Sequence, residues 1–215
     1  MTRLVLTSLR LMKHLNVLCG LALTLLWGCT AQPPPITISL APQVIVPKID
    51  LGGGRNVYLS VVDDRPNNRI LEYPEFYSAR QSQTILITSQ PIAVVLENSV
   101  GQGLKSMGFE LIPTLSSSDT QLKINVLSFY VVRIPTGFFD GNWVGKLGVK
   151  VQLYKNERQV LDKEYNSLND VSKPSPNALF LATSITPFIN PIVSDLILRI
   201  LGDLELIAAL QSPEG

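Results

Sequence analysis

The chain has 215 residues, of which 46% are hydrophobic and 16% are charged, and its formal net charge is +1. The apolar content excludes a chain that is disordered throughout, and the length suits one domain with a sizeable core. The near-neutral charge gives no electrostatic basis for a nucleic-acid partner.

The first 28 residues have the order of a secretory signal. Basic side chains come first, at Arg3, Arg10 and Lys13. The apolar run Leu15–Leu26 follows, and small Gly28 closes the segment. The run holds about twelve residues, fewer than the roughly twenty that cross a bilayer as a helix. We therefore expect residues 1–28 to be a signal peptide, cleaved between Gly28 and Cys29.

The basic region before the apolar run is longer than in most signals. Met12, followed by Lys13 and His14, would make an ordinary start. We therefore hypothesise that translation starts at Met12 rather than Met1. A precursor whose mass begins at Met1 would contradict this.

Leu26-Trp27-Gly28-Cys29 resembles the lipobox of bacterial lipoproteins. The resemblance implies that the Cys29 thiol carries diacylglycerol and that the new amine carries a further acyl chain, such as palmitate. It also implies outer-membrane sorting, because Thr30 stands where inner-membrane lipoproteins have Asp. Two or more acyl chains anchor a protein stably, whereas one holds only marginally. The alternative interpretation is a chance cysteine in an ordinary signal or a short membrane anchor.

Cleavage would remove the chemistry of histidine and of free thiols. His14 and Cys19 lie in the signal, so the mature chain would hold no histidine and one acylated cysteine. This excludes disulfides, Ser-His-Asp and Cys-His catalysis, and zinc sites built from His and Cys. The 18 Lys and Arg side chains would fall to 15 against 17 Asp and Glu, a formal charge of about −2. We expect no catalytic residue, no metal and no cofactor.

Residues 29–55 are predicted to be a Pro- and Gly-rich tether and lead-in, because prolines favour extended chain. Apolar side chains alternate in Ile36–Leu40 and in Val44–Val46, so one of these runs is expected to add an edge strand. Gly52-Gly53-Gly54-Arg55 resembles a phosphate loop only superficially, since it precedes a strand and does not open a helix.

Asn56–Val62 is predicted to be the first firm strand. Asp63-Asp64-Arg65 follows it and is a candidate acid–base pair or cation site. Adjacent strand residues point to opposite faces, which favours instead a turn in which Arg65 pairs with one of the two aspartates. Residues 69–88 stay open between strand and loop, with Thr84–Thr88 as a candidate short strand.

The first helix is predicted to begin near Ser89 as N-cap, with Pro91 in its first turn, and to end at Gly108. Apolar side chains recur at three- and four-residue steps and form one face: Ile92, Val95, Leu96, Val100, Leu104 and Met107. Gly101 and Gly103 are expected to permit close approach to a sheet.

Strands are predicted next at Phe109–Ile112, at Gln121–Arg133, and in an antiparallel hairpin of Trp143–Tyr154 with Gln159–Tyr165. The apolar pattern of the long strand changes phase: Leu122, Ile124 and Val126 face one way, and Leu127, Phe129 and Val131 the other. We expect either a bulge or a strand that is covered on both faces.

The last helical region is predicted over Pro191–Leu210. Charges at four-residue steps give it one polar face, which favours an amphipathic helix over a membrane span: Asp195, Arg199 and Asp203. The element order predicts an α+β fold, with a mixed, mostly antiparallel sheet of four to five strands and two helices on one face. The domain is expected over 56–210, followed by a tail at 211–215.

This element order on a lipobox precursor resembles the YajG family of bacterial lipoproteins. The resemblance is carried by Cys29 and the Pro-rich lead-in, the strand into Asp63-Asp64-Arg65, the helix Val94–Met107 ending in Gly108-Phe109, the strand Leu122–Phe129, the Val149–Tyr165 hairpin and the terminal helix. It covers most of the mature chain and implies an envelope location and this fold. The family has no established activity, so the resemblance implies no mechanism.

Aromatic side chains flank a turn signal at Asp140-Gly141-Asn142: Phe138, Phe139 and Trp143. Aromatics on an exposed loop mark a partner surface, and the equal alternative is that they complete the core under the loop. A second cluster, Tyr73, Phe76 and Tyr77, is expected to belong to the core.

The sequence therefore predicts a lipoprotein of a Gram-negative outer membrane that faces the periplasm and acts as a non-catalytic scaffold or binding factor. Its partners would be the membrane, through the N-terminal lipid, and an envelope protein. One alternative is a glycan or small-molecule binder that uses the aromatic loops for stacking. Another is a cell-wall hydrolase that works through carboxylates without histidine.

Overall fold

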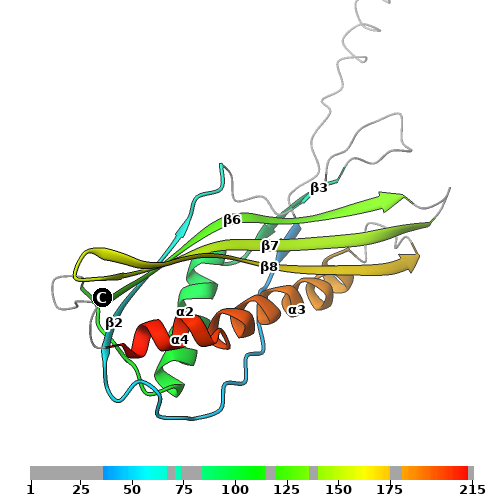
Figure 1. Cartoon of the computed structure of the whole chain (residues 1–215). Coiled ribbons are helices and arrows are strands. Elements are labelled where there is room, and N and C mark those ends of the chain that lie inside the picture. The colour runs from blue at the N-terminus through cyan, green and yellow to red at the C-terminus, as the bar shows by residue number, and fades with distance from the viewer. Residues whose placement is uncertain are drawn as a thin grey trace, which may run out of the picture. The chain divides into compact units, whose positions relative to one another are not determined.

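A five-stranded sheet carries helices on one face (Figure 1). The computed structural model describes residues 36–66, 71–73, 84–114, 120–135, 140–174 and 181–212. Its elements are β1 (Ile36–Ile38), β2 (Asn56–Asp63), β3 (Leu71–Tyr73), β4 (Thr84–Thr88), α2 (Ile92–Ser106), β5 (Glu110–Leu111), β6 (Thr120–Pro135), β7 (Asp140–Lys155), β8 (Arg158–Pro174), α3 (Leu181–Leu201) and α4 (Leu204–Gln211). The predicted α+β fold is confirmed.

The main sheet has the strand order β5-β2-β6-β7-β8. β2 runs parallel to both of its neighbours, with Leu59 opposite Leu122 of β6. β6, β7 and β8 are antiparallel, as the predicted hairpin requires. Asn156 and Glu157, both with positive φ, form the tight turn between β7 and β8. The sheet is therefore mixed, with its long strands antiparallel.

A β-bulge explains the change of phase in β6. The register with β7 shifts between Val126 and Ser128, so Leu127 is an extra residue, and it is 44% exposed. Beyond the bulge, Phe129 and Val131 are buried again. Of the two predicted explanations the bulge is therefore the correct one, because it returns the later apolar residues to the covered face.

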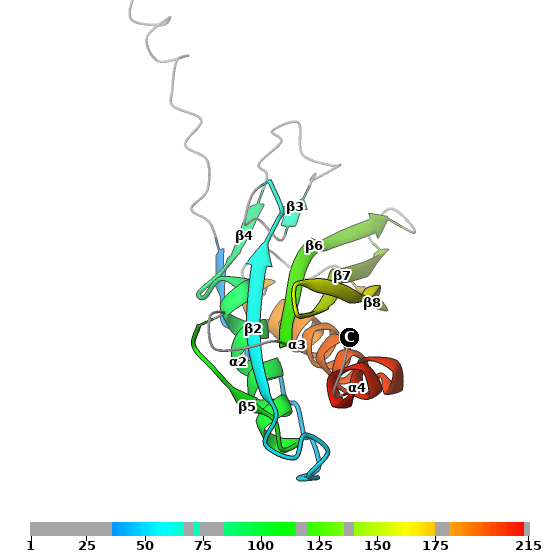
Figure 2. The same ribbon diagram turned by 60° about the vertical axis from the view of Figure 1, so that its left-hand side comes forward.

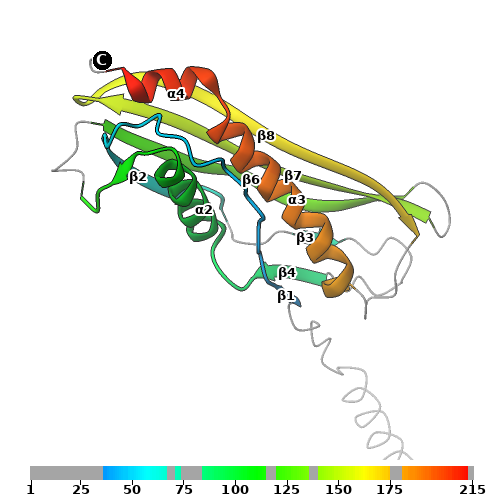
Figure 3. The same cartoon turned by 90° about the horizontal axis from the view of Figure 1, so that it is seen from below.

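The core lies between the sheet and the helices. α2 packs against β2, and α3 lies along β7 and β8 (Figures 2 and 3). Alternate strand residues and one face of each helix supply the buried side chains, among them Val57, Leu122, Ile124, Val149, Val151, Leu96, Val100, Ile189, Val193, Leu196 and Ile197. The described helices all lie on this one face of the main sheet (Figures 1 and 3), and side chains that point to the other face, such as Tyr130 and Leu168, are exposed.

The extended lead-in packs on the domain. β1 pairs in parallel with β4, which pairs antiparallel with β3. Ile36–Ile38 therefore supplies the expected edge strand, and Thr84–Thr88 is the expected short strand. Further on, the Ala41 and Gln43 N–H groups donate to Asn190 Oδ1 and Ser194 Oγ of α3, at 3.1 and 3.0 Å. The compact unit that holds the described domain starts at Pro34, so it includes the described part of the lead-in, from Ile36 onward.

Two details of α2 differ from the prediction. The N-cap is Pro91 rather than Ser89, whose N–H instead donates to Ile38 O at 2.8 Å and extends the pairing of β4 with β1. Gly101 approaches the sheet as expected, but a Cβ on Gly103 would overlap the side chain of Leu201. Gly103 therefore permits close approach of α3, not of a sheet.

The C-terminal helical region is longer than predicted and is divided. α3 begins ten residues before Pro191 and holds both Pro187 and Pro191. It ends at Leu201, and α4 follows, so the described domain has three helices where two were expected. Within the described residues, none of the helices is long and apolar enough to cross a membrane.

The polar face of α3 is shorter than predicted. Arg199 Nε and Asp195 Oδ2 form the expected i,i+4 pair at 2.7 Å. Asp203 lies outside α3, because the chain turns at Gly202, and its carboxylate caps α4 by accepting from the Glu205 and Leu206 N–H groups at 2.8 and 3.2 Å. Placing Asp203 on the α3 face was wrong, since the sequence pattern assumed a continuous helix.

Candidate functional site

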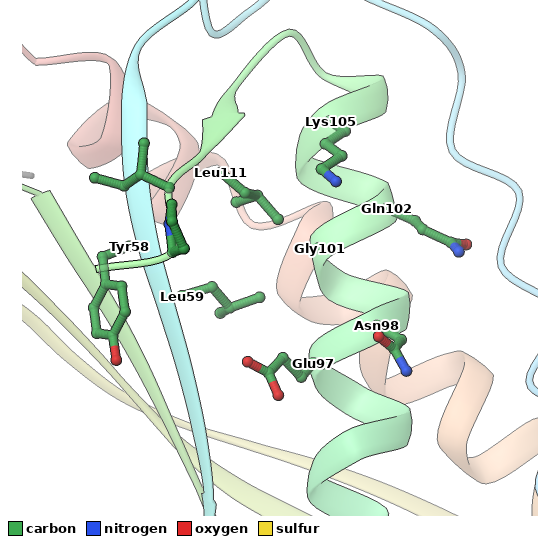
Figure 4. A pocket seen from close by; sticks show the side chains of 10 residues that line it. Tyr58, Leu59, Glu97, Asn98, Gly101, Gln102, Lys105 and Leu111 are labelled. Atoms are coloured by element: carbon green, nitrogen blue, oxygen red, sulfur yellow. The ribbon is translucent and has the colours of Figure 1, made fainter. Parts of the chain in front are cut away.

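A cleft of about 440 Å³ separates α2 from the outer edge of β2 (Figure 4). Three stretches of chain line it: Tyr58 and Leu59 of β2; Glu97, Asn98, Gly101, Gln102 and Lys105 of α2; and Leu111, Ile112 and Pro113 at and after β5. Leu59 and Leu111 form an apolar floor, while the α2 side is polar. A cleft of this size suits a small ligand or a short peptide.

Glu97, Gly101 and Lys105 follow one another at four-residue steps and so share one side of α2. Glu97 and Lys105 are exposed, and in Figure 4 the Glu97 carboxylate points into the space between the helix and β2. A Cβ on Gly101 would lie 2.9 Å from Leu111 Cδ1. Because Gly101 has no side chain, the middle of the cleft stays open above Leu111, and the charged side chains of Glu97 and Lys105 lie on either side of this opening.

The Gly-rich turn before β2 fixes the far end of α2. The Leu51 and Gly52 N–H groups donate to Met107 O at 2.9 and 2.8 Å, and Gly54 N–H donates to Gly108 O at 2.9 Å. These bonds satisfy carbonyls at the helix end that have no partner within the helix. The turn therefore docks β2 beside α2 and sets the width of the cleft, a role unrelated to phosphate binding.

Asp63 and Arg65 form a bidentate ion pair at the end of β2. Arg65 Nε and Nη2 donate to Asp63 Oδ1 and Oδ2 at 2.7 and 2.6 Å, and the Arg65 side chain is 7% exposed. Its guanidinium also donates to Phe129 O at 3.3 Å and lies 5.7 Å from the centre of that ring. Asp64 is exposed and its N–H donates to Val126 O. The two aspartates do not converge, so this arrangement holds β2 to the bulge of β6.

A second polar cluster joins β8 to the start of α4. Lys163 Nζ donates to Asp203 Oδ2 at 2.5 Å and to Glu205 Oε2 at 2.9 Å, and Tyr165 Oη donates to Asp203 Oδ2 at 2.8 Å. Burial would raise the pKa of Asp203, but the bonds from Lys163, Tyr165 and the backbone lower it to about 2. Burial and the bond to Asp203 raise the pKa of Tyr165. The carboxylate stays ionised and the phenol stays neutral, a structural arrangement rather than an acid–base pair.

The same side of β8 holds a further buried hydroxyl. Ser167 Oγ donates to Asp195 Oδ2 at 2.7 Å, beside the pair with Arg199. Burial acts to raise the pKa of Asp195, and the bonds from Arg199 and Ser167 lower it overall. A shallow hollow of about 360 Å³ lies nearby, and its lining includes Tyr165, Arg199 and Asp203. Within the described residues, no group of three or more His, Cys, Asp or Glu side chains is placed to hold a metal ion.

Comparison with protein families identifies the chain. A family model described as an uncharacterized lipoprotein matches residues 42–211, which span the domain from its lead-in to the end of α4. The chain belongs to this lipoprotein family. The comparison with curated proteins finds no match.

Several solved structures resemble this lipoprotein. A protein from Xanthomonas campestris is 16% identical with a TM-score of 0.48, and the match covers 82% of this chain and all of that one. A minor lipoprotein from Acinetobacter baumannii is 12% identical with a TM-score of 0.43, covering 70% and 90%. Rare lipoprotein B from Shewanella oneidensis is 10% identical with a TM-score of 0.40, covering 67% and 91%.

Several of the lipoprotein's predicted site residues lie outside the described residues. These are the lipobox residues Gly28 and Cys29 and the loop aromatics Phe138 and Phe139, together with Phe76 and Tyr77. Trp143 lies in β7 opposite Arg133 and Val171, and Tyr73 lies in β3, but their side chains are outside the described part. Their roles stay predictions.

Sequence reasoning missed the cleft of the lipoprotein. Its lining comes from three separate stretches of the chain. The apolar pattern that predicted α2 describes only its buried face, and Glu97 and Lys105 lie beside that face, so the pattern gave no indication of them. The one sequence feature that could have indicated the cleft was Gly101 within a strongly periodic helix. A glycine inside a helix often marks the close approach of another element.

Proposed function

We propose that this chain is an outer-membrane lipoprotein, anchored through Cys29 after cleavage at Gly28, that faces the periplasm and acts without catalysis by binding an envelope protein. Membership of the lipoprotein family supports the lipid anchor. The resemblance to the YajG family, carried by Cys29 and the element order, supports the finer assignment within the envelope, and that family name is part of the proposal.

The anchor would hold the domain close to the membrane. Six residues separate Cys29 from Ile36. A chain of this length spans at most about 25 Å when fully extended. Confinement to a thin layer raises the effective concentration toward a partner in the same membrane, so weak binding suffices.

The observation that carries the binding role is the face of the main sheet opposite the helices. Tyr130, Lys146 and Leu168 are register partners across β6, β7 and β8, so they form one row on that face. Tyr130 is 39% exposed and Leu168 is 64% exposed. An aromatic and an aliphatic side chain held on a rigid sheet are the kind of anchor that protein interfaces use.

The loop aromatics are proposed as a second contact region, at the end of the same hairpin. β6 is described to Pro135 and β7 from Asp140, so Phe138 and Phe139 belong to the connection of this hairpin. We propose Phe138, Phe139 and Trp143 as this second region. Trp143 shares the strand alternation of Gly145 and Leu147, so it is not part of the row formed by Tyr130, Lys146 and Leu168.

Photo-crosslinking in cells tests the binding role. A photoreactive phenylalanine analogue at Tyr130, at Leu168 or at Phe139 should capture the same envelope protein. The matched control is Leu204 of α4, which is 80% exposed on the helix side and should capture none. Adducts equally abundant at Leu204, or none above background at Tyr130 and Leu168, would overturn the proposal.

Two substitutions test the anchor separately. Cys29→Ser should abolish labelling by palmitate and release the domain from the membrane fraction, because no acyl chain remains. Thr30→Asp should keep the label and move the protein to the inner membrane. Retention of the label in the Cys29→Ser variant would reject this anchor without bearing on the contact surface.

A further inference from the structure

The outer edge of β2 is only partly paired. β5 lies beside the start of β2, where Asn56 pairs with Glu110 and Val57 with Leu111 (Figure 2). The last backbone bond on this side runs from Ile112 N–H to Val57 O at 3.1 Å. Beyond Val57, β2 continues for six residues, to Asp63.

The direction of the free backbone groups follows from the bonds around them. Asp64 N–H donates to Val126 O of β6, whereas Val57 O accepts from the β5 side. Successive strand residues alternate, so the N–H and C=O groups of Leu59 and Val61 point to the outer edge. Within the described residues, neither has a hydrogen-bond partner on that side. Two successive pairing positions are therefore open.

These open positions border the cleft between α2 and β2. Leu59 forms part of the cleft floor together with Leu111, and Gly101 leaves room above them. A segment lying along the edge would thus meet backbone groups on one side and the Glu97-Gly101-Lys105 stripe on the other. Peptides that add a strand use such an edge for affinity and the adjoining pockets for specificity.

The charges on α2 match the spacing of an extended chain. Glu97 and Lys105 are eight residues apart, which is about 12 Å along a helix. An extended strand covers the same distance in about four residues, and residues i and i+4 of a strand lie on one face. Residue i+2 of that strand would then lie over the apolar floor at Leu59 and Leu111.

We propose that this cleft binds an extended peptide segment of another protein, which adds a strand to β2 at Leu59 and Val61. The segment carries an acidic side chain toward Lys105, an apolar side chain over the floor and a basic side chain toward Glu97. The required pattern is two opposite charges four residues apart with an apolar residue midway.

This site is separate from the surface in the proposed function. Tyr130 and Leu168 lie on the face opposite the helices, while the peptide cleft opens at the β2 edge beside α2. A result at one site therefore leaves the other untouched. The cleft proposal also needs no lipid anchor, so the test uses the compact unit Pro34–Gly215, with its thermal unfolding recorded first to establish that it is folded.

Defined peptides test the proposal directly. The probes are two capped seven-residue peptides, Thr-Asp-Thr-Val-Thr-Lys-Thr and the same peptide with Asp and Lys exchanged. One of them should bind, and the order that binds reports whether the strand is parallel or antiparallel. In amide NMR spectra, the signals of Leu59 and Val61 should shift and their hydrogen exchange should slow.

Backbone methylation separates strand addition from charge attraction. Two forms of the binding peptide carry N-methyl groups on alternate sets of residues. Only one set of N–H groups faces β2, so one form should lose binding and the other should retain it. Equal binding of both forms would overturn strand addition, and so would failure of both unmodified peptides to shift Leu59 and Val61.

Charge reversal on α2 tests the recognition pattern. Lys105→Glu should weaken the binding peptide about fivefold, since exposed charge pairs contribute modestly. The double variant Glu97→Lys/Lys105→Glu should prefer the exchanged peptide. Arg158→Glu at the start of β8 is the charge-matched control and should leave both affinities unchanged. Thermal midpoints confirm that each variant is folded, and an unaltered peptide preference in the double variant would contradict the assigned charges.

Discussion

Gly108 shows how a single residue fixes two segments of this domain. It has φ +83° and ends α2 with the pair of bonds of a Schellman motif, from Phe109 N–H to Leu104 O and from Gly108 N–H to Lys105 O. A Cβ at this position would overlap Asp50 Oδ1, which accepts from Gly53 N–H at 2.9 Å. The residue therefore serves both the helix end and the docking of the Gly-rich turn.

Substitution of Gly108 by alanine tests both roles, and Gly53→Ala is the reference variant that changes only a backbone conformation. Gly53→Ala should cost about 1–2 kcal/mol of unfolding free energy, because its φ of +54° is left-handed while its nearest atom is 3.8 Å away. Gly108→Ala should cost more, because it also displaces Asp50. Urea unfolding of the two variants measures the difference. Equal losses would show that the packing against Asp50 contributes nothing.

Asp203 makes the unfolding free energy of the domain decrease at low pH. Its pKa is about 2 when folded, below the usual value of about 3.9 in an unfolded chain. A lowered pKa gives stability that is fully present above about pH 4, declines as the pH falls and is lost below about pH 2. The wild type should lose about 2 kcal/mol in this window that Asp203→Asn does not lose. Parallel pH profiles of the unfolding free energy for the two proteins would contradict this.

α3 shows how packing overrides local signals at the scale of an element. Pro187 and Pro191 indicate a helix boundary, since proline removes a donor and crowds the preceding turn. The helix nevertheless runs through both, because Ile185, Phe188 and Ile189 on that turn are all buried against the sheet. Burial of these side chains compensates for the lost backbone bonds.

The two faces of α3 should respond differently to truncation. Leu196 is fully buried, so Leu196→Ala should cost about 2–5 kcal/mol through lost contacts and a cavity. Leu198, two residues on, is 44% exposed, and Leu198→Ala should change the unfolding free energy by less than about 0.5 kcal/mol. Chemical denaturation of both variants checks this, and similar costs would show that the outer face of α3 is covered in solution.

At the scale of the whole molecule, the lead-in closes the domain from outside. Ile38 is 1% exposed, and the chain from Ala41 to Gly54 bonds in turn to α3 and to the end of α2. Gln211 Nε2 of α4 donates to Leu51 O at 2.9 Å, so the C-terminal helix is tied to the same segment. The extended chain thus connects elements that the sheet does not join.

Removal of the lead-in should therefore destabilise the domain. A chain that starts at Asn56 should have a lower urea midpoint than one that starts at Pro34, because it loses Ile38 and the bonds to the end of α2. Hydrogen exchange at the last turn of α2 should also rise. Identical midpoints would show that the segment before Asn56 is only a tether.

The candidate cleft illustrates which features of a site a sequence can indicate. The boundaries of β2 and α2 followed from periodicity to within a few residues, because buried faces repeat at fixed steps. The placement of Glu97 and Lys105 beside an open strand edge did not, because it depends on how far β5 extends along β2. The Asp203 cluster was also missed, since Lys163 and Tyr165 are distant in sequence and meet it only after α3 folds back on β8.

The sequence by itself determined the class of fold and the antiparallel hairpin, since both follow from local patterns of apolar residues. It reduced the change of phase in β6 to two explanations, and the register with β7 decided for the bulge. The likeness of Leu26–Cys29 to a lipobox led to the proposed lipid anchor. The position of the one histidine in the predicted signal peptide led to the proposal of a non-catalytic role. Only the tertiary structure decided the length of α3, the docking of residues 36–55 and the open edge at Leu59 and Val61. These depend on contacts between residues far apart in the chain, whose burial and pairing outweigh local preference.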